Sequence, residues 1–221
     1  IVEPLGPIDF LRRPSVQLPV GFYMFTFTAT RAGTLTVLEP YEGDTPEVVF
    51  GLYDADVNWL ADSESNGAYE RLDWDTGVTA GAQYYLTMLV LDDTAPIDLC
   101  LANLVSRSGS TLSVYGTAAV DQFEFDASSG LHVTVNGVPY DYAAGQVNQV
   151  TFDGLGSKDV AALTCSSGDD YAVLYPDRGT IKGPGYFVTL TSLEHKTVDA
   201  GGGAKDIVKI SGSNYDDTFT A

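Results

Sequence analysis

Aspartates recur at a fixed spacing in the C-terminal half of the chain, and their chemistry suits a divalent metal ion. Asp159 and Asp206 lie in the matching segments G-S-K-D-V-A-A-L and G-A-K-D-I-V-K-I, 47 residues apart (206 − 159). Asp170 and Asp217 have the same separation, and Asp121 lies 49 residues before Asp170 (170 − 121). Carboxylates stacked at the strand spacing of a sheet, about 5 Å, repel one another and attract a cation. Because carboxylate and carbonyl oxygens are preferred calcium ligands, the pattern predicts calcium binding.

A period of this length is typical of stacked repeats, in which one unit buries its apolar face only against the next. Residues 112–221 can be laid out as three short strands per turn, with glycine and aspartate at the corners. This layout predicts a short, parallel β-helix-like repeat of about two rungs and the start of a third. It places Asp159 over Asp206, and it places Asp121, Asp170 and Asp217 above one another.

The third rung begins with D-D-T-F-T-A at residues 216–221, where the sequence stops. Its backbone donors and acceptors would form an open edge, which natural proteins cap or cover. We therefore expect this end to associate with other segments of the parent protein or with copies of the same chain. Since a net charge of −19 opposes close approach, association should strengthen with salt.

A second interpretation of the aspartates stays open beside calcium, namely that they form turns and cap corners. Lys158 and Lys205 directly precede two of them, where a positive side chain would neutralise the stacked carboxylates without a metal. Ser157 and Ala204 stand where a calcium-binding repeat has flexible glycines. The sequence does not decide between the two interpretations.

The N-terminal half shows alternating strands separated by turn residues. G-F-Y-M-F-T-F-T-A, T-L-T-V-L, E-V-V-F-G-L-Y, W-L-A-D-S, Q-Y-Y-L-T-M-L-V-L and I-D-L-C-L-A-N-L-V follow one another at short intervals. This spacing predicts an all-β fold, with a sandwich of seven or eight strands in domain 1–111 and the repeat in domain 112–221. Residues 1–20 contain four prolines and are expected to be extended and poor in regular structure.

Residues 8–105 resemble the bacterial pre-peptidase C-terminal domain. The resemblance lies in Y-M-F-T-F-T-A-T-R-A-G-T-L-T-V, F-G-L-Y-D-A-D-V-N-W-L-A-D-S and V-T-A-G-A-Q-Y-Y-L-T-M, in that order. It implies a small, jelly-roll-like, non-catalytic sandwich attached to secreted enzymes and surface proteins. The chain departs from the family pattern at residues 54–60, where Val57 and Asn58 occupy the turn instead of glycine.

The C-terminal half resembles degenerate hemolysin-type (RTX-like) repeats of large secreted bacterial proteins. F-D-G-L-G-S-K-D-V and V-D-A-G-G-G-A-K-D-I-V are similar to the nonapeptide G-G-x-G-x-D-x-U-x. The resemblance implies Ca²⁺ as the bound ion and a set of aspartates as its ligands. These are Asp121, Asp153, Asp159, Asp170, Asp199, Asp206 and Asp217.

Composition narrows the classes of partner. The formal net charge is −19 and the pI about 4.1, which disfavours binding to nucleic acid and to anionic lipid. The sequence has no apolar run of transmembrane length and no signal peptide, so membrane insertion is not expected. Because Ile1 is not a start methionine, we expect a piece of a longer precursor, exported to the cell surface or the extracellular space.

No catalytic constellation is visible. The two histidines, His132 and His195, belong to neither H-E-x-x-H nor G-x-S-x-G. Acidic pairs such as Asp92-Asp93 fall in predicted turns, where aspartate is expected anyway. We therefore predict that the chain is not an enzyme. Cys100 and Cys165 fall in different halves, and the sequence cannot distinguish a disulfide from two free thiols.

Large aromatic side chains on the predicted sandwich suggest a carbohydrate site. Trp59, Trp74, Tyr84 and Tyr85 lie on its strands, and Trp59 would face solvent if its neighbour Leu60 faces the core. An exposed ring could stack on a sugar, whereas the alternative is ordinary packing of aromatics in a sandwich. We name Trp59, Trp74 and Tyr85 as the candidate ligand-binding residues.

These observations favour a non-catalytic structural or adhesive segment of a secreted or cell-surface bacterial protein. The alternative is an accessory module of a larger secreted enzyme that binds polysaccharide or extracellular matrix. An exposed aromatic row on the sandwich would favour the second function, and an open β-helix end would favour the first.

Overall fold

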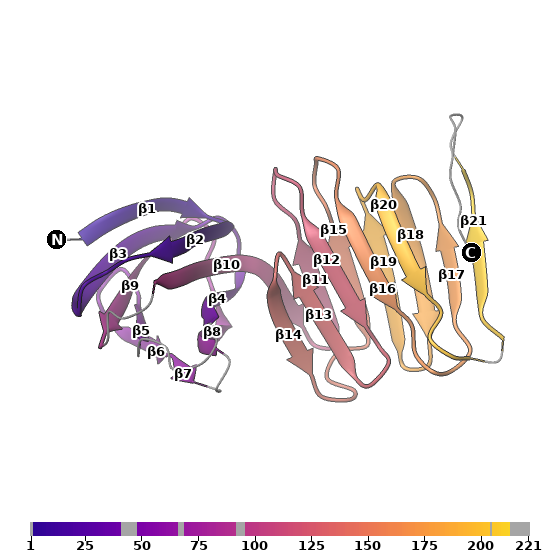
Figure 1. Cartoon of the computed structure of the whole chain (residues 1–221), viewed down its shortest axis with the longest axis horizontal. Helices are drawn as coiled ribbons and strands as arrows, with labels where there is room; N and C mark the ends of the chain where they lie inside the picture. The colour runs from indigo at the N-terminus through magenta and orange to yellow at the C-terminus, as the bar shows by residue number, and fades with distance from the viewer. Residues whose placement is uncertain (1, 41–47, 66–68, 92–95, 204, 213–221) are drawn as a thin grey trace. The chain divides into compact units, whose positions relative to one another are not determined.

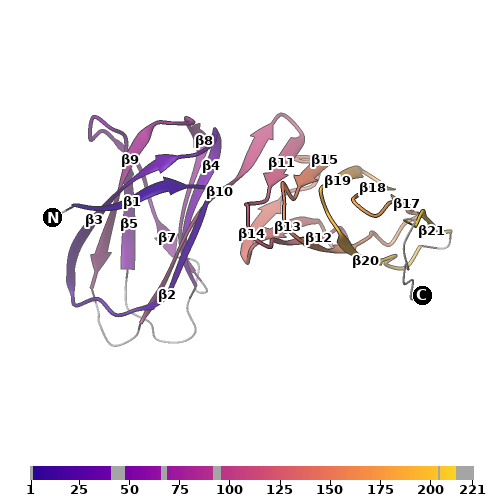
Figure 2. The same cartoon turned by 90° about the horizontal axis from the view of Figure 1, so that it is seen from above.

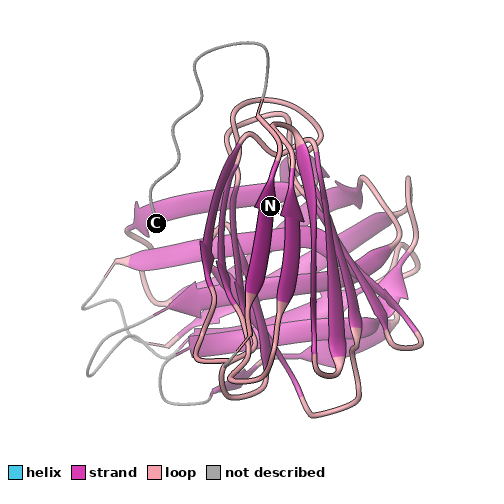
Figure 3. Cartoon of the chain, turned by 90° about the vertical axis from the view of Figure 1, so that its right-hand side faces the viewer, coloured by secondary structure: helices cyan, strands magenta, loops and turns pink. Residues whose placement is uncertain are grey.

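The chain is all-β. The structure is a computed structural model that describes residues 2–40, 48–65, 69–91, 96–203 and 205–212. These residues form strands and loops, and none of them belongs to a helix (Figure 3). In that part of the chain there is accordingly no helix long and apolar enough to cross a membrane.

The chain divides into two compact units, Ile1–Ser106 and Arg107–Ala221. Ten strands begin in the described part of the first unit (Figure 1). They are β1 (Val2–Ile8), β2 (Phe10–Val16), β3 (Gly21–Ala29), β4 (Gly33–Pro40), β5 (Val48–Tyr53), β6 (Trp59–Asp62), β7 (Glu64–Ser65), β8 (Tyr69–Val78), β9 (Gln83–Val90) and β10 (Ile97–Ser108).

The first unit is a β-sandwich of two layers (Figure 2). One layer has the strand order β1-β3-β9-β5-β6, and in the other β10 pairs with β2 and β4, followed by β8 and β7. Alternate residues point inward, so that Phe25, Phe27 and Leu52 of one layer pack with Leu35 and Leu72 of the other. Burial of these side chains is the main force that holds the layers together.

The N-terminal twenty residues are more regular than their prolines predict. β1 pairs with β3 in parallel, and β2 pairs with β10 antiparallel, so each extends one layer of the sandwich. The prediction that this segment is poor in regular structure is therefore wrong. Both strands lie at the edge of their layer, where a proline costs no ladder hydrogen bond because its missing N–H would face outward.

The second unit consists of short strands, most of them five residues long (Figure 1). They are β11 (Thr111–Tyr115), β12 (Gln122–Asp126), β13 (Leu131–Val135), β14 (Val138–Tyr142), β15 (Gln149–Asp153), β16 (Val160–Thr164), β17 (Tyr171–Leu174), β18 (Arg178–Gly183), β19 (Tyr186–Thr191), β20 (His195–Asp199) and β21 (Ile207–Ile210).

Parallel ladders organise this unit. β11, β15 and β19 form one parallel ladder, and β12, β16 and β20 form another. Antiparallel hairpins extend both, β13–β14 beside β12 and β17–β18 beside β19, while β21 pairs in parallel with β17. Phe123 on β12 stacks on Phe152 on β15, with ring centroids 4.3 Å apart, so the two ladders share an apolar core.

The register of the ladders differs from the predicted one. Gln122 pairs with Val160, 38 residues later (160 − 122), and Tyr171 pairs with Ile207, 36 residues later (207 − 171). The two matching segments, which lie 47 residues apart, therefore do not stack on each other. The first contains β16, which pairs with β12 and β20, and the second contains β21, which pairs with β17. The predicted stacking of Asp159 over Asp206 and of Asp170 over Asp121 is wrong, and Asp217 lies outside the described residues.

Candidate functional site

The aspartate corners of the second unit are buried hydrogen-bond acceptors. Asp121 is fully buried, and its carboxylate accepts hydrogen bonds from the Thr117 N–H at 2.7 Å and the Thr117 hydroxyl at 3.1 Å. Asn136, in the β13–β14 turn, donates its side-chain amide to the same carboxylate at 2.6 Å. Three donors from two loops thus converge on one carboxylate, which ties the corner before β12 to the neighbouring hairpin.

Asp159 is the next corner in the same ladder. Its Oδ1 accepts the backbone N–H of Asp121 at 2.8 Å, and its own N–H donates to Oε2 of Glu194 at 3.0 Å. Each acidic side chain therefore binds the backbone of the corner that precedes it in the ladder. Oδ2 of Asp159 is buried without a hydrogen-bond partner. Burial, with Asp121 and Glu194 close by, raises the pKa of the Asp159 carboxyl.

A second column of corners repeats this arrangement. Oδ1 of Asp206 accepts the backbone N–H of Asp170 at 2.9 Å. The Asp170 carboxylate in turn accepts the Ser166 hydroxyl at 3.1 Å and the Tyr186 hydroxyl at 2.8 Å. The structure thus brings together Asp121 with Asp159, and Asp170 with Asp206.

The other predicted ligands among the described residues, Asp153 and Asp199, make a different kind of hydrogen bond. Asp153 and Asp199 end their strands and accept the backbone N–H of the residue two positions later, at 3.2 and 3.0 Å. Within the described residues no ion pair involves Lys158 or Lys205. Neutral N–H and O–H donors bind the carboxylates there instead, and neutralisation by the lysines stays a prediction.

This donor set fits corner-capping carboxylates better than a calcium cage. N–H and O–H groups point their hydrogens at the Asp121 and Asp170 oxygens, whereas calcium needs several oxygens free to face it. In the portion of the chain described, no three His, Cys, Asp or Glu side chains converge as a metal site would require. Calcium binding stays a prediction, in competition with hydrogen-bonded corners.

We expect chelation to change the melting temperature of the chain by little. A metal that binds only the folded state stabilises it by mass action, so EDTA would lower the melting temperature if calcium held the corners. Hydrogen bonds already satisfy most of these carboxylates. Calorimetry with and without EDTA checks this, and a large loss of stability would show that the corners depend on a metal.

The outer face of the first unit carries an aromatic row. Trp59 on β6 pairs directly with Tyr53 on β5, and Tyr53 pairs with Tyr85 on β9. The chain neighbours Leu60, Leu52 and Tyr84 pack into the core, so the three rings of the row share the opposite, outer face. The indole of Trp59 is the most open of them, with 60% of the residue exposed.

A tight turn positions the indole. Asp54 accepts hydrogen bonds from the backbone N–H of Asp56 and Asn58, at 2.9 and 2.8 Å, and from the Asn58 side chain. Val57, which stands where the resembling family has glycine, adopts a left-handed φ of 63°. The pairing shifts by one residue after this turn, so that Trp59 rather than Leu60 lies opposite Tyr53. Trp59 also donates its indole N–H to Asp62 at 2.9 Å.

The other aromatic candidates have packing roles. Trp74 lies half-buried against the core and donates its indole N–H to the Gly77 carbonyl at 3.1 Å. Tyr84 is buried and stacks on Phe27, with ring centroids 5.7 Å apart. Sequence reasoning missed Tyr53, although its alternation with the core residue Leu52 already places it on the outer face.

Comparisons with known proteins give a structural likeness for the first unit. No protein-family model and no curated protein matches the chain. Among solved structures it is similar to the pre-peptidase C-terminal domain of a collagenase from Bacillus anthracis. The match covers 46% of this chain and 93% of that domain, at 15% sequence identity and a TM-score of 0.34. That domain belongs to the family which residues 8–105 resemble in sequence, and the hemolysin-type resemblance stays a prediction.

The two histidines lie apart. His132 on β13 contacts Asp141 on β14, with Nδ1 and Oδ1 2.5 Å apart, and both side chains are exposed. His195 lies on β20 of the same sheet, with β12 and β16 between it and β13. Both cysteines are buried and free, and burial raises the pKa of the Cys100 thiol to about 12.

Two buried glutamates form a further acidic pair, which sequence reasoning missed. Glu39 on β4 lies directly opposite Glu70 on β8, and only 2% of Glu39 is exposed. Glu70 accepts the hydroxyl of Ser63, whereas Oε2 of Glu39 has no hydrogen-bond partner. Burial, followed by the charges of Glu70 and Asp98, raises the pKa of Glu39 to about 7.

Proposed function

We propose that the chain is a non-catalytic structural and adhesive segment of a secreted or cell-surface bacterial protein. The second unit is its structural part, a short parallel β-helix of degenerate hemolysin-type repeats. Its two parallel ladders support this, and so do its corner hydrogen bonds, in which the carboxylates of Asp159 and Asp206 accept the backbone N–H of the preceding corners, Asp121 and Asp170. Such an array is extended by adding rungs of the same kind.

The first unit is the adhesive part, and the aromatic row is the observation that carries this function. Trp59, Tyr53 and Tyr85 lie side by side on neighbouring strands of one sheet. Adjacent strands are about 4.8 Å apart, so the three rings start from strands that span about 10 Å. Aromatic faces of this kind stack on the apolar faces of sugar rings.

Polar groups flank the row and can bind hydroxyl groups. Asp62 lies beside the indole, and Gln83 and Thr26, joined by a 2.7 Å hydrogen bond, lie beside Tyr85. Gly51 lets the Thr87 hydroxyl and the Tyr53 ring pack closely against its backbone, because a Cβ there would lie 2.7 Å from the hydroxyl and 3.3 Å from the ring. With a net charge of −19, a neutral or cationic polysaccharide suits this face better than an anionic one.

The second candidate function is an accessory module of a larger secreted enzyme, which binds polysaccharide or extracellular matrix. An exposed aromatic row is the feature expected to favour this second function, and the row on the first unit supports it. The open repeat end expected to favour the first function, residues 216–221, lies outside the described residues. The two functions share this binding face and differ in what the rest of the parent protein does.

We expect Trp59→Ala to weaken polysaccharide binding by about tenfold, the upper end of what one aromatic stacking contact contributes. The measurement is affinity electrophoresis of the chain through a neutral β-glucan and, separately, a glucosamine polymer. Trp74→Phe is the matched control, since Trp74 packs against the core and should leave retardation unchanged. The adhesive function fails if neither polymer retards the native chain, or if Trp59→Ala is retarded as strongly as the native chain.

A further inference from the structure

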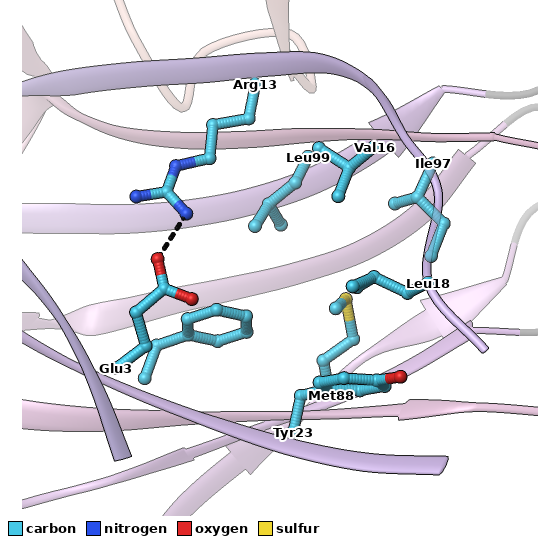
Figure 4. A pocket seen from close by; sticks show the side chains of 9 residues that line it. Glu3, Arg13, Val16, Leu18, Tyr23, Met88, Ile97 and Leu99 are labelled. Carbon is cyan, nitrogen blue, oxygen red and sulfur yellow. Dashed lines mark hydrogen bonds and ion pairs between the residues drawn. The ribbon is translucent and has the colours of Figure 1, made fainter. Parts of the chain in front are cut away.

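A small cavity lies between the two layers of the first unit, on the side formed by edge strands β1 and β2 (Figure 4). Its volume is about 150 Å³. Residues from five strands and one loop line it, namely Glu3, Arg13, Val16, Leu18, Tyr23, Phe25, Met88, Ile97 and Leu99. It is separate from the aromatic row, which lies on the outer face of the same sheet.

The cavity is apolar inside and charged at one end. Phe25, Met88 and Leu99 are almost fully buried, so they give the interior a surface of hydrocarbon, thioether and ring. At the charged end, Nη1 of Arg13 binds Oε1 of Glu3 at 2.7 Å (Figure 4). These two side chains are 36% and 52% exposed, so a ligand in solution can reach them.

The Arg13 guanidinium has unused hydrogen-bonding capacity. A guanidinium carries five N–H donors in a planar fork that matches a carboxylate bidentately. Across the described residues, the one hydrogen bond of the Arg13 guanidinium runs from Nη1 to Oε1 of Glu3. A second carboxylate can therefore bind the free edge of the fork while Glu3 stays in place.

From this geometry we propose that the cavity binds a compact monocarboxylic acid with an aromatic or branched alkyl body. The carboxylate binds Arg13, and the apolar body fills the space beside Met88 and Leu99. An apolar cavity of this volume accommodates a group about the size of a benzene ring. Glu3 opposes the ligand charge at the rim, so its removal should strengthen binding. This proposal is independent of the aromatic row and of the second unit.

The test uses phenylacetate as the probe and the full chain labelled with ¹³C at its methionine methyls. The sequence has two methionines, and only Met88 lines the cavity, while Met24 provides an internal reference. Titration with phenylacetate should shift the Met88 signal in a saturable manner and leave Met24 in place. Toluene, which lacks the carboxylate, should bind about tenfold more weakly, since a hydrogen bond to a charged group contributes about 1.5 kcal/mol or more.

Variants separate the charge contribution from simple filling of space. Arg13→Gln should weaken phenylacetate binding about tenfold and leave toluene binding unchanged, and Glu3→Gln should strengthen phenylacetate binding. Arg12→Gln is the matched control, because Arg12 is the adjacent residue on β2 and pairs with Asp98 at 2.6 Å, away from the cavity. The proposal is overturned if Met88 does not respond to phenylacetate, if toluene binds as tightly, or if Arg12→Gln and Arg13→Gln behave alike.

Discussion

Replacing Asp121 by asparagine should destabilise the second unit by about 3 kcal/mol, whereas the same change at Asp159 should shift its stability by less than about 1 kcal/mol. The two residues are consecutive corners of one ladder, and both are fully buried. They differ in what their carboxylates accept, so the pair isolates the contribution of the hydrogen bonds.

At Asp121, every part of the carboxylate is engaged. Thr117 donates its backbone N–H and its hydroxyl, and Asn136 donates its amide. An asparagine amide turned toward these groups places donor against donor, which leaves at least one buried group unsatisfied. At Asp159, only Oδ1 has a partner, and an asparagine oxygen can accept the same N–H of Asp121. Neutralising this side chain also removes a buried charge beside Asp121 and Glu194.

Urea unfolding of the full chain, followed by circular dichroism, measures both effects. Trp59 and Trp74 both lie in the first unit, so tryptophan fluorescence reports that unit separately and should be unchanged in both variants. Equal destabilisation by the two substitutions would show that burial of charge, and not the donor set, decides the energetics of the corners.

The stability of the first unit should fall between acid and neutral pH because of Glu39. Its pKa is about 7 in the folded chain, against an ordinary value of 4.5. Below pH 4.5 the carboxyl is protonated in both states, and the stability associated with it is fully present. As the pH rises toward 7, the unfolded chain releases this proton while the folded chain keeps it, so unfolding becomes easier. The full loss, reached above pH 7, is roughly 3 to 4 kcal/mol, at about 1.4 kcal/mol for each pKa unit between 4.5 and about 7.

Glu39→Gln should remove this loss. Glutamine has the shape of the protonated side chain and stays neutral, so the variant should be more stable than the native chain at pH 8 and similar to it at pH 4. Glu70 and Asp98 are the two charges that raise the pKa of Glu39, and both are acidic. Glu64→Gln is the control, because Glu64 on neighbouring β7 is exposed. If tryptophan-monitored unfolding of Glu39→Gln keeps the pH dependence of the native chain, the assignment to Glu39 is wrong.

Sequence patterns predicted the strands of this protein well and their partners poorly. Alternation of apolar and polar residues marks segments such as Q-F-E-F-D and Q-V-T-F-D, which are β12 and β15. This alternation reflects which face of the strand each residue lies on, and it can be read from the sequence alone. Which strands pair in parallel depends on how many strands the chain forms before it comes back to the same sheet. The spacing of 47 residues between similar segments does not give that number.

The matching segments around Asp159 and Asp206 show why the period misled. They are similar because both are corners in which a carboxylate accepts the N–H of another corner, Asp121 in one case and Asp170 in the other. The same corner geometry thus occurs before β16 and again before β21. The two segments are therefore similar in sequence because they have the same local structure, and not because they are in contact with each other.

For the candidate sites too, the sequence predicted local features and missed those that depend on strand pairing. Exposure of Trp59 followed from its neighbour Leu60, whereas the row with Tyr53 and Tyr85 depends on strand pairing and on a register shift after the Asp54 turn. Likewise, neither Glu39 nor Glu70 stands out in the sequence, because they become a pair only when β4 and β8 align. Tertiary pairing creates these sites from residues that are unremarkable one at a time.

Disulfide cross-linking between designed cysteines tests the stacked architecture most directly. Glu124 and Ala162 face each other on β12 and β16, and Val173 and Lys209 face each other on β17 and β21. Parallel neighbours lie about 5 Å apart, within the reach of a disulfide. Cys100 and Cys165 are buried, so they should not compete.

The Glu124→Cys/Ala162→Cys and Val173→Cys/Lys209→Cys variants should each form an intramolecular disulfide on mild oxidation, read by peptide mass spectrometry. Ala162→Cys/Lys209→Cys, the pair that a 47-residue register would bring together, should stay reduced. Efficient cross-linking of the third pair, or failure of the first two, would contradict the stacked ladders on which the structural function rests.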